Sequence, residues 1–216
     1  CDLHYSDGSP STLAPRQVLK NIINLLDEEN LRAIVAPELE FYLCEQNLDP
    51  DLPLKTPIGK SGRRESGSRV FGIDAVNEFD TLTDDIYDYC EILKIGVDTL
   101  IHESGPSQIE INLNHGDPLA LADQAFMFKR AVRQVALKHG IHATFMAKPY
   151  QGHPGSSMHI HHNLVSSNTK KNLFCDEDGN NSPTFFKFIG GLQTYLPDAM
   201  LFFAPYVNSY RRFVID

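Results

Sequence analysis

Two imidazoles stand one residue apart directly after a turn of small residues, in the segment HPGSSMHIHHN at residues 153–163. In an extended chain His159 and His161 point to one face of the strand, and Met158 and Ile160 point to the other. A pair of imidazoles can bind a metal ion, but a lone His-x-His is more often satisfied by its neighbours. What this pair does therefore depends on four glutamates in other segments of the chain.

Two of these glutamates lie in APELEFYLCE, where Glu38 and Glu40 alternate with apolar residues and share one strand face. Their Cα atoms are about 7 Å apart in a strand, because each residue rises by about 3.3 Å. The other two lie in HESGPSQIEINLNH, where Glu110 is on the polar face of a second strand and Glu103 precedes that strand. Three segments thus present acidic or imidazole groups on one face.

These carboxylates have two interpretations. In the first, they face water on a half-solvated sheet, which shows the same alternation. In the second, they converge in one cavity, where their mutual repulsion costs several kcal/mol unless cations lie between them. Mg²⁺ and Mn²⁺ prefer such oxygen ligands, and four carboxylates with one or two imidazoles suit two ions. The set contains too many oxygens for a structural zinc site.

Helical spacing of apolar residues, together with end signals, predicts the helices that must frame these strands. They are a helix over 15–30, one that starts at an N-cap Thr83 and ends near Gly96, one from Asp117-Pro118 to Gly140, and one from Ser182-Pro183 to about Pro197. Strand-like runs are predicted at 33–44, 108–114, 143–148 and 158–165.

The elements alternate without βαβ regularity, which predicts an α+β fold: a curved, mainly antiparallel sheet, open like a partial barrel, with helices packed on its outer face. Residues 47–72 contain many Pro, Gly, Ser and basic residues and are predicted to form a long loop. Loops of this length tend to be functional or mobile, and a lid, an interface and a disordered insertion all stay open.

The composition limits the class of protein. Hydrophobic residues make up 42% and charged residues 22% of the 216 residues, as in ordinary globular proteins, and no apolar run reaches the length of a membrane span. A formal charge of −9 argues against a nucleic-acid surface. Four cysteines without paired spacing and the lack of a signal peptide predict a cytoplasmic protein without disulfides.

Taken together, APELEFYLCE, HESGPSQIEINL, ATFMAKPYQGHPGSSMHIHHNL and NSYRRFV resemble the catalytic domain of the glutamine synthetase family over essentially the whole chain. The stretches YQGHPGSSMHIH and FGIDAVNEFD are most similar to the branch that joins glutamate to polyamines, the gamma-glutamylpolyamine synthetases. The chain starts at a cysteine and stops within an apolar run, so residues 1–216 are expected to be part of that domain. The small N-terminal domain and the C-terminal part of the catalytic domain are expected to lie outside it, which would leave the isolated piece inactive.

The resemblance implies a role for each matching position. Glu40, Glu103 and Glu110 match the ligands of one divalent ion, and Glu38 and His159 match ligands of a second. His161 and Asn163 match the nucleotide-binding part, Gly155 matches a glutamate-binding backbone position, and Arg212 matches the catalytic arginine that holds the substrate carboxylate. Arginine suits this task because its planar guanidinium meets a carboxylate with two parallel hydrogen bonds.

Three positions depart from the family pattern. Pro154 stands where Asn is usual, Ser157 where Gly is usual, and Asn163 where Ser is common. Pro154 removes a side-chain amide and a backbone donor at a substrate-binding position. Members of the polyamine branch tolerate proline there, so the change agrees with that branch.

The implied reaction is an ATP-dependent joining of glutamate to an amine, such as putrescine, through γ-glutamyl phosphate, in a ring-like homo-oligomer with Mg²⁺ or Mn²⁺. The alternatives are a glutamine synthetase that uses ammonia, a catalytically inactive relative, and, least favoured, a two-metal hydrolase. The motifs do not identify the amine, because the acidic composition fits a cationic substrate and a solvated surface equally well.

Overall fold

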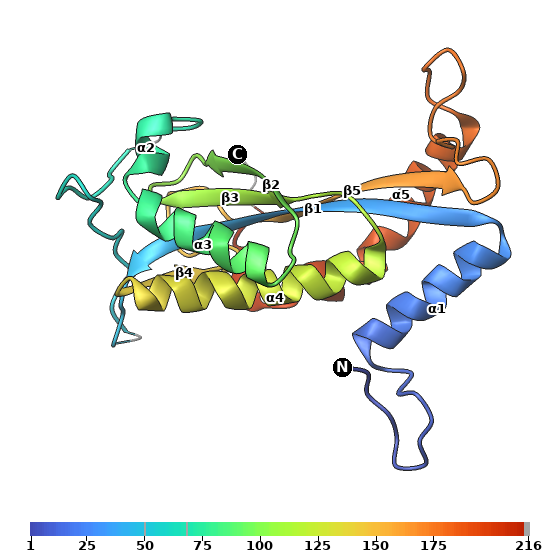
Figure 1. The fold of residues 1–216 in the computed structure, drawn as a ribbon, viewed down its shortest axis with the longest axis horizontal. Coiled ribbons are helices and arrows are strands. Elements are labelled where there is room, and N and C mark those ends of the chain that lie inside the picture. Colours follow the sequence, from blue (N-terminus) through green and yellow to red (C-terminus); the bar gives the residue numbers. More distant parts are fainter. Residues whose placement is uncertain (50, 68, 214–216) are drawn as a thin grey trace. The chain divides into compact units, whose positions relative to one another are not determined.

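The computed structural model describes residues 1–49, 51–67 and 69–213 of the chain. Helices and strands follow one another in a mixed order (Figure 1). The helices are α1 (Pro15–Glu28), α2 (Ile73–Asn77), α3 (Asp80–Ile92), α4 (Pro118–Lys138), α5 (Pro183–Phe203) and α6 (Val207–Tyr210). The strands are β1 (Leu31–Glu45), β2 (Val97–His102), β3 (Gln108–Leu113), β4 (Ile141–Thr144) and β5 (Met158–Ser166).

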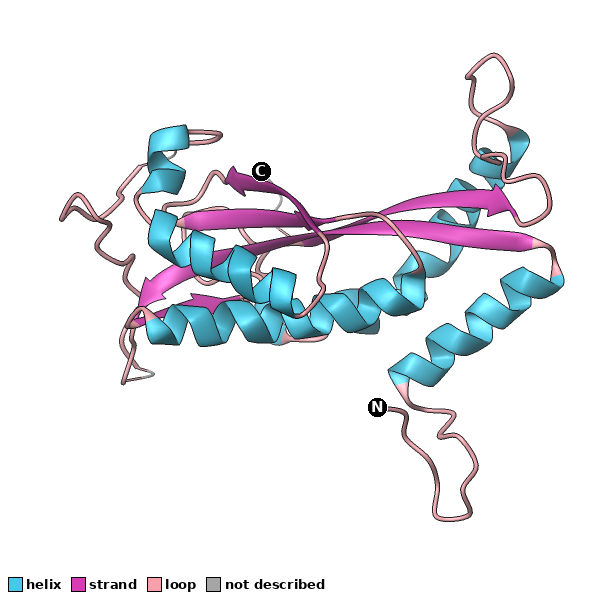
Figure 2. Cartoon of the chain, in the orientation of Figure 1, coloured by secondary structure: helices cyan, strands magenta, loops and turns pink. Residues whose placement is uncertain are grey.

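The strands form one five-stranded sheet. Its order is β2-β3-β1-β4, and β5 pairs with β1 outside this path (Figure 2). β1 runs antiparallel to both β3 and β4, and β2 runs antiparallel to β3. The predicted α+β class with a mainly antiparallel sheet is therefore confirmed.

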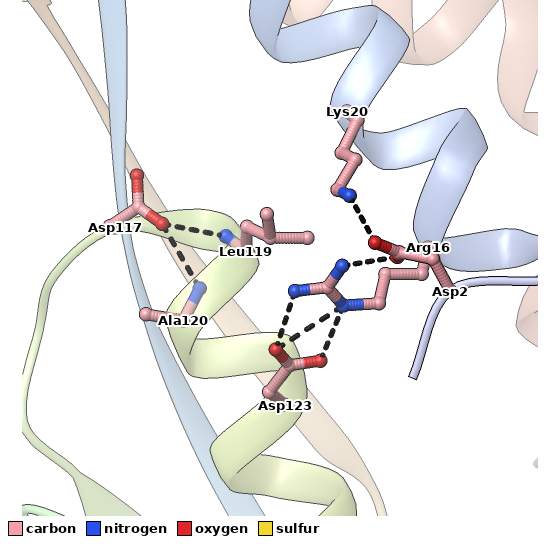
Figure 3. A network of polar contacts seen from close by, with 7 residues as sticks. All are labelled: Asp2, Arg16, Lys20, Asp117, Leu119, Ala120 and Asp123. Atoms are coloured by element: carbon pink, nitrogen blue, oxygen red, sulfur yellow. Dashed lines mark hydrogen bonds and ion pairs between the residues drawn. The ribbon is translucent and has the colours of Figure 1, made fainter.

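The chain folds into two compact units, and the first contains residues 1–36, 115–123 and 161–200. Here the Arg16 guanidinium donates to both carboxylate oxygens of Asp123 and also to Asp2, which in turn accepts from Lys20 at 2.7 Å (Figure 3). These contacts hold the N-terminal segment against α1 and against the start of α4. Asp117 caps α4 as predicted, because its Oδ1 accepts from two backbone amides of the first turn.

The second unit contains residues 37–114, 124–160 and those from 201 onward. The apolar face of its sheet is the core: Leu39, Phe41 and Leu43 of β1 and Ile109 and Ile111 of β3 are at most 1% exposed. In this unit α3 and the later part of α4 run along the strands (Figure 1), and each contributes buried apolar residues. Burial of this face fixes the strand register, since a slip by one residue would turn the apolar set to the other side.

Several predicted boundaries were wrong. α3 begins at Asp80, and Thr83 lies inside its first turn, where its hydroxyl donates to the Asp80 carbonyl. α5 continues past Pro197 to Phe203, so the proline lies inside the helix and does not end it. β4 ends at Thr144 rather than at residue 148, because the backbone of Lys148 hydrogen-bonds to the side chain of Asn208.

Three elements were not predicted: α2, α6 and β2. β2 carries no clean alternation and has an irregular register between Val97 and Leu100. The long loop before α2 contains only an isolated bridge, between Ile58 and Arg64, within its described residues. None of the helices in the described part of the chain is both long and apolar enough to cross a membrane.

Candidate metal centre and substrate turn

The polar faces of β1 and β3 meet in register. Glu40 lies directly opposite Glu110, Glu38 opposite Asn112, and Tyr42 opposite Gln108. Residues paired in this way project to the same side of an antiparallel sheet, opposite the apolar core. The predicted face is therefore formed, and it carries three of the four glutamates identified in the sequence.

β5 brings His159 to the same place. Its Nδ1 is 3.3 Å from Glu38 Oε2 and 4.0 Å from Glu40 Oε1. Glu38, Glu110 and His159 each offer one ligand atom, and these atoms lie within 4.8 Å of one another. The structure thus brings together residues that the resemblance assigned to two different ions. Glu110 lies opposite Glu40, and it is also close to Glu38 and His159.

Glu103 belongs to the same electrostatic group. It follows β2 directly, and its backbone N–H donates to the Gln108 carbonyl at 2.9 Å. Burial raises the pKa of Glu110 to about 7, and the charges of Glu38, Glu103 and Glu40 add to this effect. A carboxyl group whose ionisation is opposed by burial and by three neighbouring carboxylates is stabilised in its charged form by a cation.

Glu40 is held by three donors. Its Oε2 accepts from the Gln108 amide and from the Ser157 backbone N–H, both at 3.1 Å, and its Oε1 accepts from the Ser157 hydroxyl. The Glu40 backbone N–H also donates to the Ser157 carbonyl. This carboxylate therefore has a fixed orientation before any ligand binds.

The turn that precedes β5 is fixed through its carbonyls. The Lys148 ammonium donates to the His153 carbonyl at 2.5 Å, the Tyr42 hydroxyl to the Pro154 carbonyl at 2.8 Å, and the Gln108 amide to the Gly155 carbonyl at 3.0 Å. Because Pro154 takes part only through its carbonyl, the missing backbone donor at this position leaves these contacts intact.

Position 155 has no room for a side chain, so glycine is required there. A Cβ atom there would lie 2.5 Å from the Ala147 carbonyl oxygen and 2.9 Å from Arg212 Cγ. The Arg212 side chain thus packs directly on Gly155, as expected if both contribute to one binding site. Asn208 holds this segment: its Oδ1 accepts from the Lys148 N–H at 2.7 Å and its Nδ2 donates to the Lys148 carbonyl at 2.9 Å.

A cavity of about 560 Å³ adjoins this region, and its lining includes Glu40, Ser156, Ser157, Lys129, Arg133 and Arg212. Ser156 is 5% exposed, and its hydroxyl has no hydrogen-bond partner among the described residues. The cavity therefore combines cationic groups with an available hydroxyl, which suits an anionic ligand.

The two residues predicted to bind the nucleotide belong to the first compact unit. His161 and Asn163 lie on β5 within the first unit, and their part in nucleotide binding stays a prediction. The neighbouring His162 packs its ring 5.8 Å from that of Phe188. Burial lowers the pKa of His162, and the neighbouring His161 adds to this effect.

Sequence reasoning missed three residues that organise the site: Gln108, Ser157 and Asn208. Gln108 is 1% exposed and joins Glu40 to the Gly155 turn through one amide nitrogen. The alternation in the sequence already placed Gln108 on the same strand face as Glu110. An amide beside several carboxylates on that face was the signal that could have identified it. The contacts of Ser157 and Asn208 span 117 and 60 residues of sequence, and no local pattern indicates them.

The donor set fits a hard divalent cation. It consists of carboxylate oxygens and one imidazole, and Asn112, opposite Glu38, has a buried Oδ1 without a partner in the described part of the chain. Mg²⁺ and Mn²⁺ are ions that prefer such ligands. Four of the five candidate metal-binding side chains come from strands, which are rigid supports. The fifth, Glu103, directly follows β2.

Comparison with known proteins gives a consistent result. Residues 12–216 match the family model described as glutamine synthetase, catalytic domain. The chain is 40% identical over 209 residues to the gamma-glutamylputrescine synthetase PuuA of Escherichia coli (strain K12), covering 96% of this chain and 44% of that protein. It is 35% identical over 210 residues to the glutamine synthetase of Pyrococcus abyssi (strain GE5 / Orsay), covering 97% and 45%.

Solved structures agree with the fold. The structure titled apo GmaS without ligand superposes with a TM-score of 0.83 at 29% identity, covering 98% of this chain and 48% of the other. The Plasmodium falciparum glutamine synthetase has the same fold, with a TM-score of 0.84 at 24% identity and coverage of 98% and 46%. The chain spans less than half the length of these relatives. A family match over residues 12–216 shows that the chain belongs to the glutamine synthetase family, as part of its catalytic domain.

Proposed function

We propose that the full-length protein is an ATP-dependent ligase that joins the γ-carboxyl group of glutamate to an amine, with a polyamine such as putrescine as the first candidate. The observation that carries this proposal is the convergence of Glu38, Glu110 and His159 beside the turn on which Arg212 packs. The polyamine is favoured by the 40% identity to a gamma-glutamylputrescine synthetase, against 35% to a glutamine synthetase over nearly the same length.

The reaction needs activation because a carboxylate is a poor acylating agent: its leaving group would be oxide. In the first step a γ-carboxylate oxygen bonds to the γ-phosphorus of ATP, and the bond to ADP breaks. In the second, the amine nitrogen attacks the carbonyl carbon, inorganic phosphate leaves, and the nitrogen loses a proton. Both steps depend on positioning and on neutralisation of charge more than on covalent help from the protein.

The residues that would hold two divalent ions are Glu40, Glu103 and Glu110 for one, and Glu38 and His159 for the other. When bound, such ions neutralise the phosphoryl oxygens as charge builds during transfer. Glu40 contributes an orientation already fixed by Gln108 and Ser157. The raised pKa of Glu110, about 7, means that this group must lose its proton to serve as a ligand near neutral pH.

Glutamate would be held at the Gly155 turn. Arg212 is suited to hold its α-carboxylate, because a guanidinium meets a carboxylate through two parallel hydrogen bonds. Gly155 lets the backbone approach the substrate closely, and the carbonyls of its turn are fixed by donors from the sheet. These residues orient the substrate. His161 and Asn163 are proposed to contact the nucleotide, and the working protein is proposed to be a homo-oligomeric ring in the cytoplasm.

A panel of amines tests the proposal. Full-length protein with ATP, Mg²⁺ and glutamate is given ammonia, putrescine, spermidine or ethanolamine, and phosphate release is measured. We expect release with putrescine or spermidine. Release with ammonia alone would support the glutamine synthetase alternative, for which the 35% identity to an archaeal glutamine synthetase is the favouring observation. No phosphate release with any amine, in a protein that still binds ATP, would support a catalytically inactive relative.

A further inference from the structure

The side chain of one glutamate in the long loop is mostly shielded from solvent, although the residues on both sides of it are exposed. The side chain of Glu65 is 9% exposed, whereas Arg64 and Ser66 are exposed residues. Burial of a charged group is unfavourable unless strong partners compensate for the lost water. Glu65 therefore needs specific partners, and they show what the loop does.

The partners of Glu65 lie at both ends of the turn between β2 and β3. Its Oε2 accepts from the Ser107 backbone N–H at 2.6 Å and lies 2.9 Å from His102 Nε2. His102 is 1% exposed and is the last residue of β2, while Ser107 directly precedes β3. One carboxylate oxygen thus joins the two ends of the turn at residues 103–107.

The same turn carries Glu103, one of the proposed metal ligands. The second ring nitrogen of His102, Nδ1, is 2.8 Å from the Glu103 carbonyl oxygen. A carbonyl can only accept, so Nδ1 carries a proton and donates it to the backbone of Glu103. The chain of contacts therefore runs from the loop, through an inaccessible imidazole, to the backbone of a candidate ligand.

The loop is attached to this turn a second time. The Phe71 backbone N–H donates to the His102 carbonyl at 2.9 Å. Ser107 has a left-handed backbone with φ of 57°, a conformation that costs energy for a residue with a side chain and persists only where neighbours enforce it. Its N–H bonds to Glu65 and its carbonyl accepts from the Leu43 N–H, so both of its backbone groups are held.

We propose that Glu65 is a positioning residue: by joining His102 to Ser107 it fixes the 103–107 turn and so places Glu103 toward Glu40 and Glu110. The part of the loop around Glu65 and Phe71 then supports the metal centre through the turn at residues 103–107. This inference rests on the proposed function only in taking Glu103 as a metal ligand.

A carboxylate oxygen accepts hydrogen bonds more strongly than an amide oxygen, and Glu65 Oε2 faces two groups at once, the Ser107 N–H and His102 Nε2. Glu65→Gln preserves the size of the side chain but replaces the carboxylate with a neutral amide, so it weakens the link between the two ends of the turn.

The test compares Glu65→Gln with Glu45→Gln in the full-length protein. Glu45 also pairs with this loop, through Arg64, but at a partly exposed position, so it is the matched control. Mn²⁺ affinity is measured by electron paramagnetic resonance without substrates, and exchange of the residue 103–107 amides is measured by hydrogen–deuterium exchange. Loss of a group that orients a metal ligand typically weakens metal binding by about 10- to 100-fold.

We expect Glu65→Gln to weaken Mn²⁺ binding by at least about tenfold and to speed exchange at residues 103–107. Glu45→Gln should match wild type in both measurements. If Glu65→Gln does not fold, His102→Gln, which removes the donor to the Glu103 carbonyl, is read in the same way. Wild-type Mn²⁺ affinity in the folded variant overturns the inference.

The outcome is separable from that of the ligase assay. A wild-type protein that binds Mn²⁺ and is inactive with every amine contradicts the proposed function, and weakened Mn²⁺ binding in Glu65→Gln then still supports the positioning role. An active ligase whose Glu65→Gln variant binds Mn²⁺ normally supports the proposed function and overturns the positioning role.

Discussion

Glu40 and Glu110 face each other as register partners on two neighbouring antiparallel strands, both nearly buried, at 8% and 6% exposure. Like charges directly opposite each other destabilise a sheet, more so where water is excluded. The fold therefore contains a local electrostatic conflict, which a bound divalent cation would relieve. Two questions follow: whether the two carboxylates repel each other in metal-free protein, and whether metal binding relieves that repulsion.

The first prediction concerns stability against pH in metal-free protein. The pKa of Glu110 rises from 4.5 in the unfolded chain to about 7 in the folded one, so the folded state holds this proton more tightly. The resulting stabilisation is complete below about pH 4.5 and is lost as the pH rises through about 7. At about 1.4 kcal/mol per pKa unit the loss is at most on the order of 3 kcal/mol.

Urea unfolding of wild type and Glu110→Gln from pH 5 to pH 8 measures this loss, because the difference between the two proteins isolates Glu110 from groups such as His162. We expect the free energy of unfolding of wild type to fall relative to the variant as the pH rises. Saturating Mg²⁺ should abolish that decline. A constant difference across this range would show that the carboxyl ionises normally.

The second prediction concerns Gln108, which joins a candidate metal ligand to the substrate turn. Gln108→Leu removes the donors to Glu40 and to the Gly155 carbonyl, so Mn²⁺ binding should weaken and the KM for glutamate should rise together, each by about tenfold or more. Gln124→Leu is the control, since Gln124 is a glutamine whose side chain bonds to the backbone elsewhere, by accepting from the Gly96 N–H. Loss of glutamate affinity with intact Mn²⁺ affinity would contradict the bridging role.

The third prediction concerns Gly155. A methyl group at this position would collide with the Ala147 carbonyl and with Arg212, so Gly155→Ala should displace the arginine and raise the KM for glutamate by about tenfold or more, since correct placement governs such steps. Gly190→Ala, at a helical position with nothing within 4 Å, should leave the KM unchanged and is the control. Steady-state kinetics at saturating ATP and amine measures both variants. Equal KM values in Gly155→Ala and wild type would remove Gly155 from the site.

The alternation of residue types predicted much of this site. Glu38, Glu40 and Glu110 lie on the polar face opposite the buried Leu39 and Ile111, because a strand with one buried face permits a single register. Side-chain caps were readable for α4 at Asp117 and for α5 at Ser182, since both bind backbone amides within three residues. Periodicity and capping are local properties, and the sequence contains them directly.

The remaining features depend on contacts between distant segments. Glu65 lies 37 residues from His102, and nothing in the loop sequence indicates that its side chain is mostly shielded from solvent whereas Asp49 and Asp51 are exposed. β2 was missed because its sequence, VDTLIH, does not alternate cleanly, and its register with β3 is irregular. The predicted end of α5 was wrong because Pro197 lies inside the helix and does not end it. Local propensity cannot report interactions that only the folded backbone creates.

The most direct test is a Mn²⁺ titration of the full-length protein, followed by electron paramagnetic resonance at pH 8, for wild type and Glu110→Gln. Glu110→Gln keeps the shape of the side chain but removes the charge that faces Glu40. The account predicts that wild type binds Mn²⁺ and that the variant, although folded and more stable without metal, loses at least one Mn²⁺ site. Equal Mn²⁺ stoichiometry and affinity in the two proteins would contradict it.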